Sequence, residues 1–463
     1  MRQKPLPLLF SLAAAIGMFF GYKLQKSGPD ELVSSHNSDQ LGLISEVHNL
    51  VRNNYFGDLD TGQYVESVIS QLASELDAYS GYIRPIDVDG FRHAIEGNYR
   101  GLGFDFITMD DSLVVIEVIA NSPAEKADLQ RGDIILELKN PNDIYKGSKE
   151  MLNQIMLVDS AALRIYRPFS EYEFQVNIKK GQIDNSPIKS KILGNGSIVY
   201  IKISRFSDDV FLAFMEELEH YKRNGLEFSK LIIDLRSNPG GLLDETIKIL
   251  NQLIPESNKT ILSTINSNGK KKEYKSNGRS FLKIMDIAVL IDGFSASASE
   301  ILAGSLQDLE LATIVGSNSF GKGRIQQHFE LSNGGTINLT IGEYLLPSGR
   351  RIKSATHDSI GHGITPDIIV AQDCHSDQKR FHEQYAYLFK QGLIHNKVLS
   401  TQQLQNIISS YEEEVNFHNP NESNCLLQNL STLLWHEFQS ELNLNAELIQ
   451  QDVALSRAID HLK

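Results

Sequence analysis

The 463-residue sequence is short of positive charge and almost free of cysteine. Its 44 Lys and Arg residues are outnumbered by 58 Asp and Glu residues, which gives a formal net charge of −14. This balance argues against a nucleic-acid partner, because binding to phosphates needs a basic face. The two cysteines, Cys374 and Cys425, exclude a dense disulfide framework and leave a single bridge open.

Only one long apolar run stands out, residues 5–22, and basic residues flank it on both sides. This pattern is typical of an export signal, and its length is near the lower limit for a bilayer span. No clear A-x-A cleavage site follows. We therefore expect residues 1–26 to anchor the chain in the inner membrane, with the rest exported to the cell envelope or periplasm. A cleaved signal is the alternative, and it predicts the same compartment without the anchor.

The residue pattern of the remaining chain changes several times, and the length allows roughly two to four domains. Residues 27–95 begin as a polar linker and continue with helical periodicity. Short strands and turns follow, and after them strands alternate with helices, which predicts an α/β core. The last segment is polar and helical. The predicted divisions after the anchor are 27–95, 96–180, 181–370 and 371–463.

The stretch GSNSFGKG, residues 316–323, is similar to a phosphate-binding P-loop, but it lacks that motif's metal-binding hydroxyl. A P-loop needs Ser or Thr after its lysine and a helix that opens there. Here Gly323 follows Lys322, and the next residues do not read as a long helix. The alternative is that Lys322 serves as a base for a nucleophile.

A candidate nucleophile lies upstream in SASAS, residues 295–299, where a buried strand gives way to a helix. Backbone N–H groups gather at a helix start and can stabilise an oxyanion. Ser297 and Glu300 also fit the S-x-x-E capping box, so a purely capping role is the stronger interpretation from this pattern alone. Gly240, in the turn NPGG of a second strand-to-helix junction, can approach a ligand closely or can simply form a tight turn.

Five motifs in order resemble the C-terminal processing peptidases, or tail-specific proteases: DLRSNPGGLLDE, FSASASEILAG, FGKGRIQ, YLLPSGRRI and GITPDI. The resemblance covers roughly residues 95–370 and implies a multidomain α/β serine peptidase with an embedded PDZ domain. It assigns the nucleophile to Ser297, the general base to Lys322 and a supporting role to Gln326. It also implies oxyanion donors at the backbone of Gly240 and Ala298.

In the segment 96–180, YRGLGFDF resembles the carboxylate-binding loop of a PDZ domain, which implies peptide binding by Gly101, Leu102, Gly103 and Phe104. Asp128 departs from the family, which usually has glycine there. The resemblance thus implies an endopeptidase that recognises C-terminal tails and needs no metal or cofactor. A catalytically silent PDZ scaffold is the alternative. Whether the helical ends form a homo-oligomer stays open.

Overall fold

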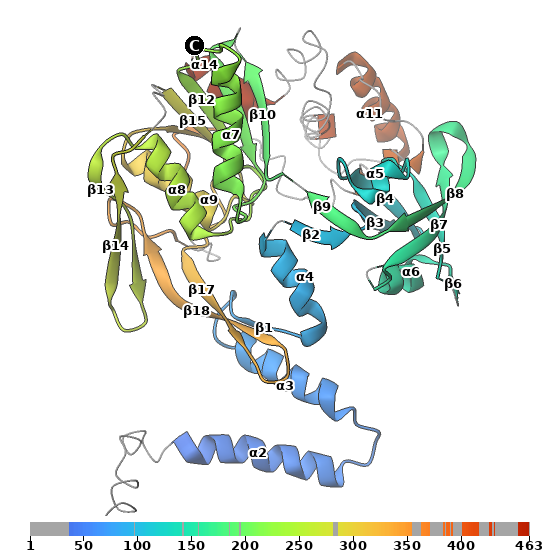
Figure 1. The fold of residues 1–463 in the computed structure, drawn as a ribbon. Helices are drawn as coiled ribbons and strands as arrows, with labels where there is room; N and C mark the ends of the chain where they lie inside the picture. Colours follow the sequence, from blue (N-terminus) through green and yellow to red (C-terminus); the bar gives the residue numbers. More distant parts are fainter. Residues whose placement is uncertain are drawn as a thin grey trace, which may run out of the picture. The chain divides into compact units, whose positions relative to one another are not determined.

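The computed structural model describes residues 37–353 and 363–370, apart from 97, 141–142, 156, 185, 194–195 and 281–285. Beyond residue 370 it describes mainly 401–415 and 452–462. Its contacts divide the chain into two units, 1–75 and 76–463 (Figure 1). The predicted anchor and both cysteines lie outside the described residues. Within the described ranges, no helix is long and apolar enough to cross a membrane.

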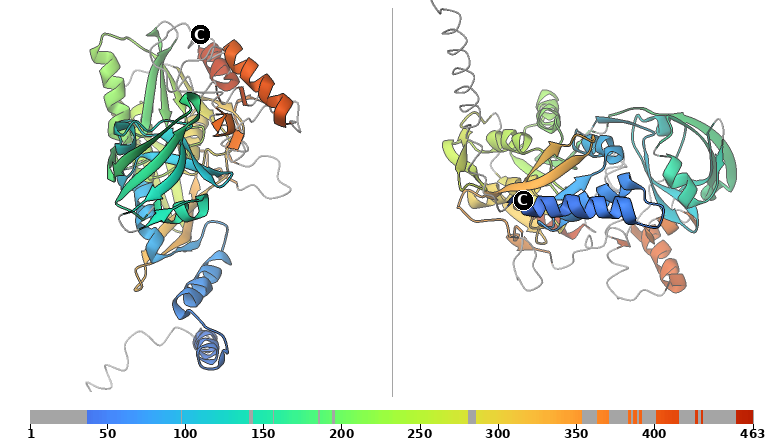
Figure 2. Two further views of the ribbon diagram at one scale, coloured as in Figure 1. Left: turned by 90° about the vertical axis from the view of Figure 1, so that its right-hand side faces the viewer. Right: turned by 90° about the horizontal axis from the view of Figure 1, so that it is seen from below.

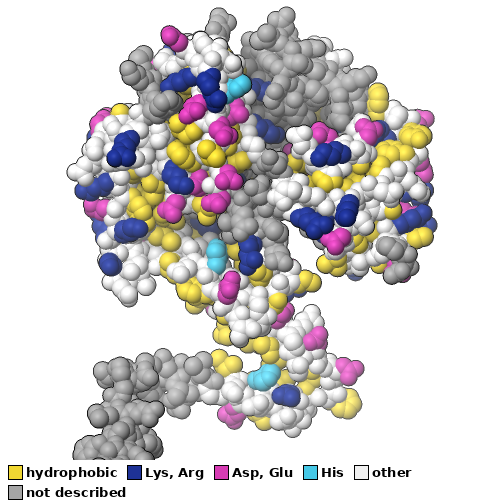
Figure 3. Space-filling view, viewed as in Figure 1, with side chains coloured by type: hydrophobic (Ala, Val, Ile, Leu, Met, Phe, Trp, Pro, Cys, Tyr) yellow, Lys and Arg dark blue, Asp and Glu magenta, His cyan; other side chains and the backbone are white. Residues whose placement is uncertain are grey.

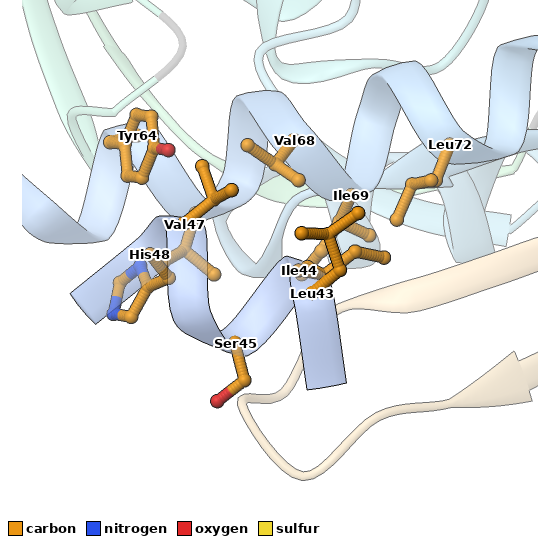
Figure 4. A pocket seen from close by; sticks show the side chains of 10 residues that line it. Leu43, Ile44, Ser45, Val47, His48, Tyr64, Val68, Ile69 and Leu72 are labelled. Atoms are coloured by element: carbon orange, nitrogen blue, oxygen red, sulfur yellow. The ribbon is translucent and has the colours of Figure 1, made fainter. Parts of the chain in front are cut away.

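The described part of the first unit contains two helices, α2 (Asn37–Asn54) and α3 (Thr61–Ser74). The Asp60 carboxylate caps α3 by accepting hydrogen bonds from the backbone of Gly62 (3.0 Å) and Gln63 (3.1 Å). Apolar side chains of both helices line an open groove of about 660 Å³ (Figure 4). Leu43, on its rim, is 59% exposed.

The second unit is built on a six-stranded sheet that confirms the predicted α/β core. Five of its strands are parallel, and only the first pairs antiparallel. In sheet order the strands are β10 (Ile188–Leu193), β11 (Ile198–Ile203), β12 (Lys230–Asp234), β15 (Asp286–Ile291), β16 (Thr313–Gly316) and β19 (Ile368–Ile369).

Helices cover both faces of this sheet, which explains why its central strands are continuous apolar runs. Alternate residues of β11 face opposite cores: Val199 and Ile201 pack in one cluster, Ile198 and Tyr200 in the other. The first core is closed by α7 (Val210–Arg223), α8 (Leu243–Leu253) and α9 (Ala298–Asp308), and the second by α11 (Thr401–Val415) and α14 (Val453–Leu462) (Figures 1 and 2).

A second sheet combines strands from distant parts of the sequence. Its first strand, β1, precedes helix α4 (Pro85–Glu96) and pairs antiparallel with β18, so that Tyr82 lies opposite Ile337. The helical periodicity of 27–95 did not predict this strand. The members of the sheet are β1 (Gly81–Ile83), β13 (Ser257–Asn266), β14 (Lys271–Asn277), β17 (Arg324–Glu330) and β18 (Thr336–Leu345).

A smaller β-sheet with its own apolar core forms between residues 102 and 179. Strand β3 is an edge strand of this sheet. Along the chain, β2 (Asn98–Gly101) comes just before the sheet and β9 (Gly181–Asp184) just after it, and these two strands pair antiparallel. The sheet contains β3 (Phe104–Met109), β4 (Ser112–Val118), β5 (Ile134–Lys139), β6 (Ile144–Tyr145), β7 (Ser160–Arg167) and β8 (Tyr172–Lys179), with helices α5 (Pro123–Lys126) and α6 (Ser148–Ile155) and the 3₁₀ turn Pro168–Ser170.

Asp128 shows why glycine suits its position. Its φ of 59° is left-handed, a conformation that glycine adopts without steric cost and Asp or Asn tolerate better than most residues. Local hydrogen bonds hold the aspartate there: Arg167 donates to its carbonyl at 2.6 Å, and Gln130 donates to its side chain at 3.0 Å. The departure from the family pattern is therefore accommodated inside the turn after α5.

On the surface, Lys and Arg side chains are scattered among Asp and Glu on the face shown in Figure 3. Charges are also found inside the protein. Arg236, 3% exposed, donates to Asp234 (2.6 Å) and to Asp452 (2.8 Å), and Asp452 also caps α14 by accepting from Leu455 N–H at 3.0 Å. The Asp452 carboxylate therefore fastens α14 to the end of β12.

We expect Asp452→Ala to lower the free energy of unfolding by about 2–4 kcal/mol, because it removes a helix cap and one partner of a buried charge. Urea denaturation followed by circular dichroism measures this. The control is Asp460→Ala on the exposed side of the same helix, where a change within about 0.5 kcal/mol is expected. Equal effects of the two substitutions would contradict the anchoring role.

Candidate active site

The candidate site residues lie where three neighbouring parallel strands end. Strands β12, β15 and β16 are adjacent in the sheet, so their carboxyl ends share one edge. The NPGG turn follows β12, the SASAS segment follows β15, and the lysine loop follows β16. In open α/β sheets ligands bind at this edge. The topology thus brings together three motifs that are far apart in the sequence.

The structure distinguishes the three serines of SASAS. Ser295 and Ser299 are fully buried, and their hydroxyls donate to the carbonyls of Leu235 and Asn238, both at 2.9 Å. These two serines join the SASAS segment to residues 235–238, which lead from β12 into the NPGG turn. Ser297 lies between them, partly exposed. Ser297 is therefore the serine of the three that a substrate can reach.

The backbone of Ser297 is strained, with a φ of 54° and a ψ of −112°. A non-glycine residue in this region is costly and persists only where its surroundings enforce it, as at the nucleophile of some hydrolases. Its N–H donates to the Glu300 carboxylate at 2.8 Å, which confirms the backbone half of the predicted capping box.

The Glu300 side chain joins the serine to the lysine loop. Glu300 is fully buried, and its carboxylate accepts four hydrogen bonds. One oxygen accepts from Ser297 N–H and Lys322 N–H, both at 2.8 Å. The other accepts from the Ser319 hydroxyl (2.6 Å) and Gly321 N–H (2.7 Å). Burial raises the pKa of Glu300, and these four donors oppose the rise by stabilising the charged form.

The Lys322 side chain lies in surroundings that favour its neutral form. Burial lowers the pKa of Lys322 below its ordinary value, although the Glu300 charge acts in the opposite direction. Among the described residues, no carboxylate forms an ion pair with its ammonium group. The backbones of Ser297 and Lys322 are held on one oxygen of Glu300, and a lysine whose pKa is lowered is a better proton acceptor than an ordinary lysine.

Gly240 packs against the serine. A Cβ at this position would lie 2.7 Å from the carbonyl oxygen of Ala296 and 2.9 Å from Cβ of Ser297, so only glycine fits. Its φ of 101° also favours glycine. The N–H of Gly240 donates to the side-chain carbonyl of Asn238 at 2.8 Å, so in this conformation it has an internal acceptor. Its oxyanion role stays a prediction, as does that of Ala298 N–H at the first position of α9.

Comparison with known proteins agrees with these motifs: residues 197–370 match peptidase family S41. The matched segment is less than half of the 463-residue chain. A probable CtpA-like serine protease of Staphylococcus aureus (strain COL) is 28% identical over 338 residues, covering 72% of this chain and 65% of that protein. The carboxy-terminal processing protease CtpB of Bacillus subtilis (strain 168) is 29% identical over 347 residues, covering 73% and 69%.

Among solved structures, a photosystem II D1 C-terminal processing protease aligns with 74% of this chain and 90% of its own, at 21% identity and a TM-score of 0.43. This chain matches less than two thirds of the length of the staphylococcal relative.

The P-loop alternative does not fit the local structure of the lysine loop. Strand β17, and not a helix, begins directly after Gly323 at Arg324. A Cβ at Gly323 would lie 2.4 Å from the carbonyl oxygen of Ile352, so the glycine is needed for close backbone packing. The rejection of a phosphate site, made from the missing hydroxyl, agrees with this local structure.

Two residues of the site were missed by sequence reasoning. Glu300 was considered only as a helix cap, whereas it also holds the lysine loop. Tyr79 was not considered, and its ring centroid lies 5.7 Å from the Lys322 amine. Gln326, the predicted supporting residue, donates to the carbonyl oxygen of Tyr79. No local signal identified Tyr79, because it lies more than 200 residues upstream.

The predicted peptide-binding residues lie together at the start of β3. Gly103, with a φ of 91°, packs against Ser122, which leaves no room for a Cβ. The carbonyls of Leu102 and Gly103 accept from Ala124 N–H and Ile119 N–H, both at 2.9 Å, and this fixes the loop beside α5. Gly101 ends β2, and Phe104 begins β3. Their role in binding stays a prediction.

We expect Gly240→Ala to reduce peptide hydrolysis about 100-fold, because the new Cβ displaces Ser297 and a misplacement of about 1 Å has an effect of this size. Steady-state kinetics on a peptide substrate measures it. The matched control is Gly269→Ala, which also has a positive φ (73°) but open space around the new Cβ. If both variants keep full activity, the contact with Ser297 is unimportant for catalysis.

Proposed function

We propose that this chain is a serine endopeptidase that uses Ser297 as nucleophile and Lys322 as general base. The observation that carries the proposal is the shared carboxylate. Glu300 binds the backbone N–H of both residues, so the reachable serine and the lysine of lowered pKa are held as one unit. The match of residues 197–370 to peptidase family S41 supports the same chemistry.

In the proposed reaction, neutral Lys322 accepts the hydroxyl proton of Ser297 as the serine oxygen attacks the scissile carbonyl. The tetrahedral intermediate collapses to an acyl-enzyme, and the lysine ammonium returns the proton to the departing amine. Lys322 then takes a proton from water as the water attacks the ester, and the lysine ammonium returns that proton to the departing oxygen of Ser297. This step restores the free serine and the neutral lysine. The reaction needs no metal and no cofactor. Backbone N–H groups of Ala298 and Gly240 are the proposed oxyanion donors, and Gly240 must first release Asn238.

Substrate recognition is assigned to the small β-sheet of residues 102–179, which resembles a PDZ domain. Such domains bind an extended peptide along a sheet edge and hold its terminal carboxylate on backbone N–H groups. Strand β3 lies at the edge of the described sheet, directly after the loop Gly101–Phe104, and this supports the assignment. The proposed substrates are exported proteins with free C-terminal tails, cleaved by an enzyme that residues 5–22 tether to the membrane.

We expect Ser297→Ala and Lys322→Ala each to lower peptide hydrolysis at least about a thousandfold, because the nucleophile or its base is lost. Hydrolysis of a fluorogenic peptide, with circular dichroism as a folding check, measures this. Ser299→Ala is the matched control: it loses a buried hydrogen bond, so it lowers stability by about 1–3 kcal/mol and keeps most of the activity. A folded wild-type protein without hydrolysis would favour the silent scaffold.

A free C-terminal carboxylate on the substrate should lower KM. We expect an amidated peptide to be cleaved with a KM about tenfold higher and a similar kcat, since the amide loses only the binding contacts of the carboxylate. Paired kinetics on the two forms of one peptide measure this. Equal KM values would contradict carboxylate capture and leave the Ser297–Lys322 assignment untouched.

A further inference from the structure

We propose that Tyr79 is a positioning residue for the general base: its ring shields the Lys322 amine from water, and Gln326 acts on the lysine through Tyr79. The inference rests on the proposed function of Lys322. It adds to the site a residue that lies outside the segment matched to family S41.

The ring position carries the first part of the inference. Tyr79 is partly buried, and its ring centroid lies 5.7 Å from the Lys322 amine. Its hydroxyl donates to the carbonyl of Gly321 at 3.5 Å, which is too long for a strong bond. The contact with the lysine loop is therefore made mainly by the aromatic face.

The backbone of Tyr79 is held from three sides. Its N–H donates to the Asp77 carboxylate at 2.8 Å. Its carbonyl accepts from the Asn338 side chain at 3.1 Å and from the Gln326 side chain. The next residues form β1, which pairs with β18. A side chain on so well fixed a backbone can cover its neighbour in one defined position.

The bonding of Gln326 carries the second part. Its amide donates to the carbonyl of Tyr79, and in the described part of the chain it makes no hydrogen bond to Lys322. The amide therefore orients the segment that carries the ring. Any effect of Gln326 on the lysine then depends on the presence of that ring.

Within the described ranges, the Lys322 amine lies over the ring of Tyr79 and interacts electrostatically with the Glu300 carboxylate and the imidazole of His328. The pKa of His328 is itself lowered by burial and by the Lys322 charge. The ring has two opposing effects. Its cation–π attraction favours the charged lysine, weakly at this distance. Its exclusion of water favours the neutral lysine, and burial is the largest cause acting on the pKa of Lys322, which is lowered. Burial dominates, so removal of the ring should favour the charged form.

The test measures the pKa of Lys322 in the full-length Ser297→Ala protein by competitive acetylation with acetic anhydride over a range of pH, read by mass spectrometry. In Tyr79→Ala we expect this pKa to rise by about one unit, which leaves roughly tenfold less neutral lysine at neutral pH. Tyr79→Phe keeps the ring and should leave the value unchanged. Unchanged values in a folded Tyr79→Ala protein would overturn the proposal.

Two controls separate the effect of the Tyr79 ring from a general loosening of the structure. Tyr82→Ala, three residues along the same segment, removes an aromatic ring that bonds to Asn333 and should not move the Lys322 pKa. Lys191, whose pKa is lowered to about 8, should titrate unchanged in every variant. A shift of Lys322 in the Tyr82 variant as large as that in Tyr79→Ala would indicate loosening of the segment and contradict a specific role of Tyr79.

A double-mutant cycle tests the route through Tyr79. Gln326→Leu alone should raise the Lys322 pKa, and in the Tyr79→Ala background it should add nothing further. Additive shifts would mean that Gln326 acts on the lysine directly and would overturn the second part.

The pH profile of kcat/KM in the active protein provides a second readout. Its acid limb should move to higher pH in each variant in which the pKa of Lys322 rises. If the wild-type protein hydrolyses no peptide, the proposed function fails, while the acetylation result still decides the role of Tyr79.

Discussion

The candidate site depends on one buried carboxylate. Glu300 is inaccessible to water, so its charge needs protein donors, and four are provided by the two segments it joins. Because Ser297 and Lys322 share one of its oxygens, the serine backbone and the lysine backbone cannot move apart without breaking a charge-assisted bond. The strained backbone of Ser297 is enforced by the same bond.

This arrangement resolves an apparent conflict in the electrostatics. A carboxylate close to a lysine ordinarily stabilises the ammonium form, which would spoil a base. Here all four hydrogen bonds of Glu300 come from backbone N–H groups and a hydroxyl, and its charge is spread over them. The lysine side chain instead lies where burial outweighs the remaining attraction, so its pKa is lowered. Glu300 thus joins the two segments while the pKa of the Lys322 amine stays lowered, as the proposed role of Lys322 as a base requires.

The sequence predicted the central sheet well because its information is local. Continuous apolar strands such as KLIIDLR and amphipathic helices such as residues 210–223 carry their own periodicity. The choice among three serines could not be made from the capping pattern, since only the packing of Ser295 and Ser299 on a distant turn reveals which hydroxyl is reachable. Tyr79 and strand β1 were missed because their partners lie more than 200 residues away.

The position of Tyr79 bears on how such proteins can be recombined. The residues that match the peptidase family begin at 197, yet Gln326 and Asn338 both donate to a carbonyl at position 79, and β1 completes a sheet around them. The matched segment is thus not a self-contained module. A chimera that takes the peptidase segment from one homologue and the upstream segment from another must keep residues 77–83 with the former, so that the carbonyl at position 79 stays placed for the partly buried amides of Gln326 and Asn338.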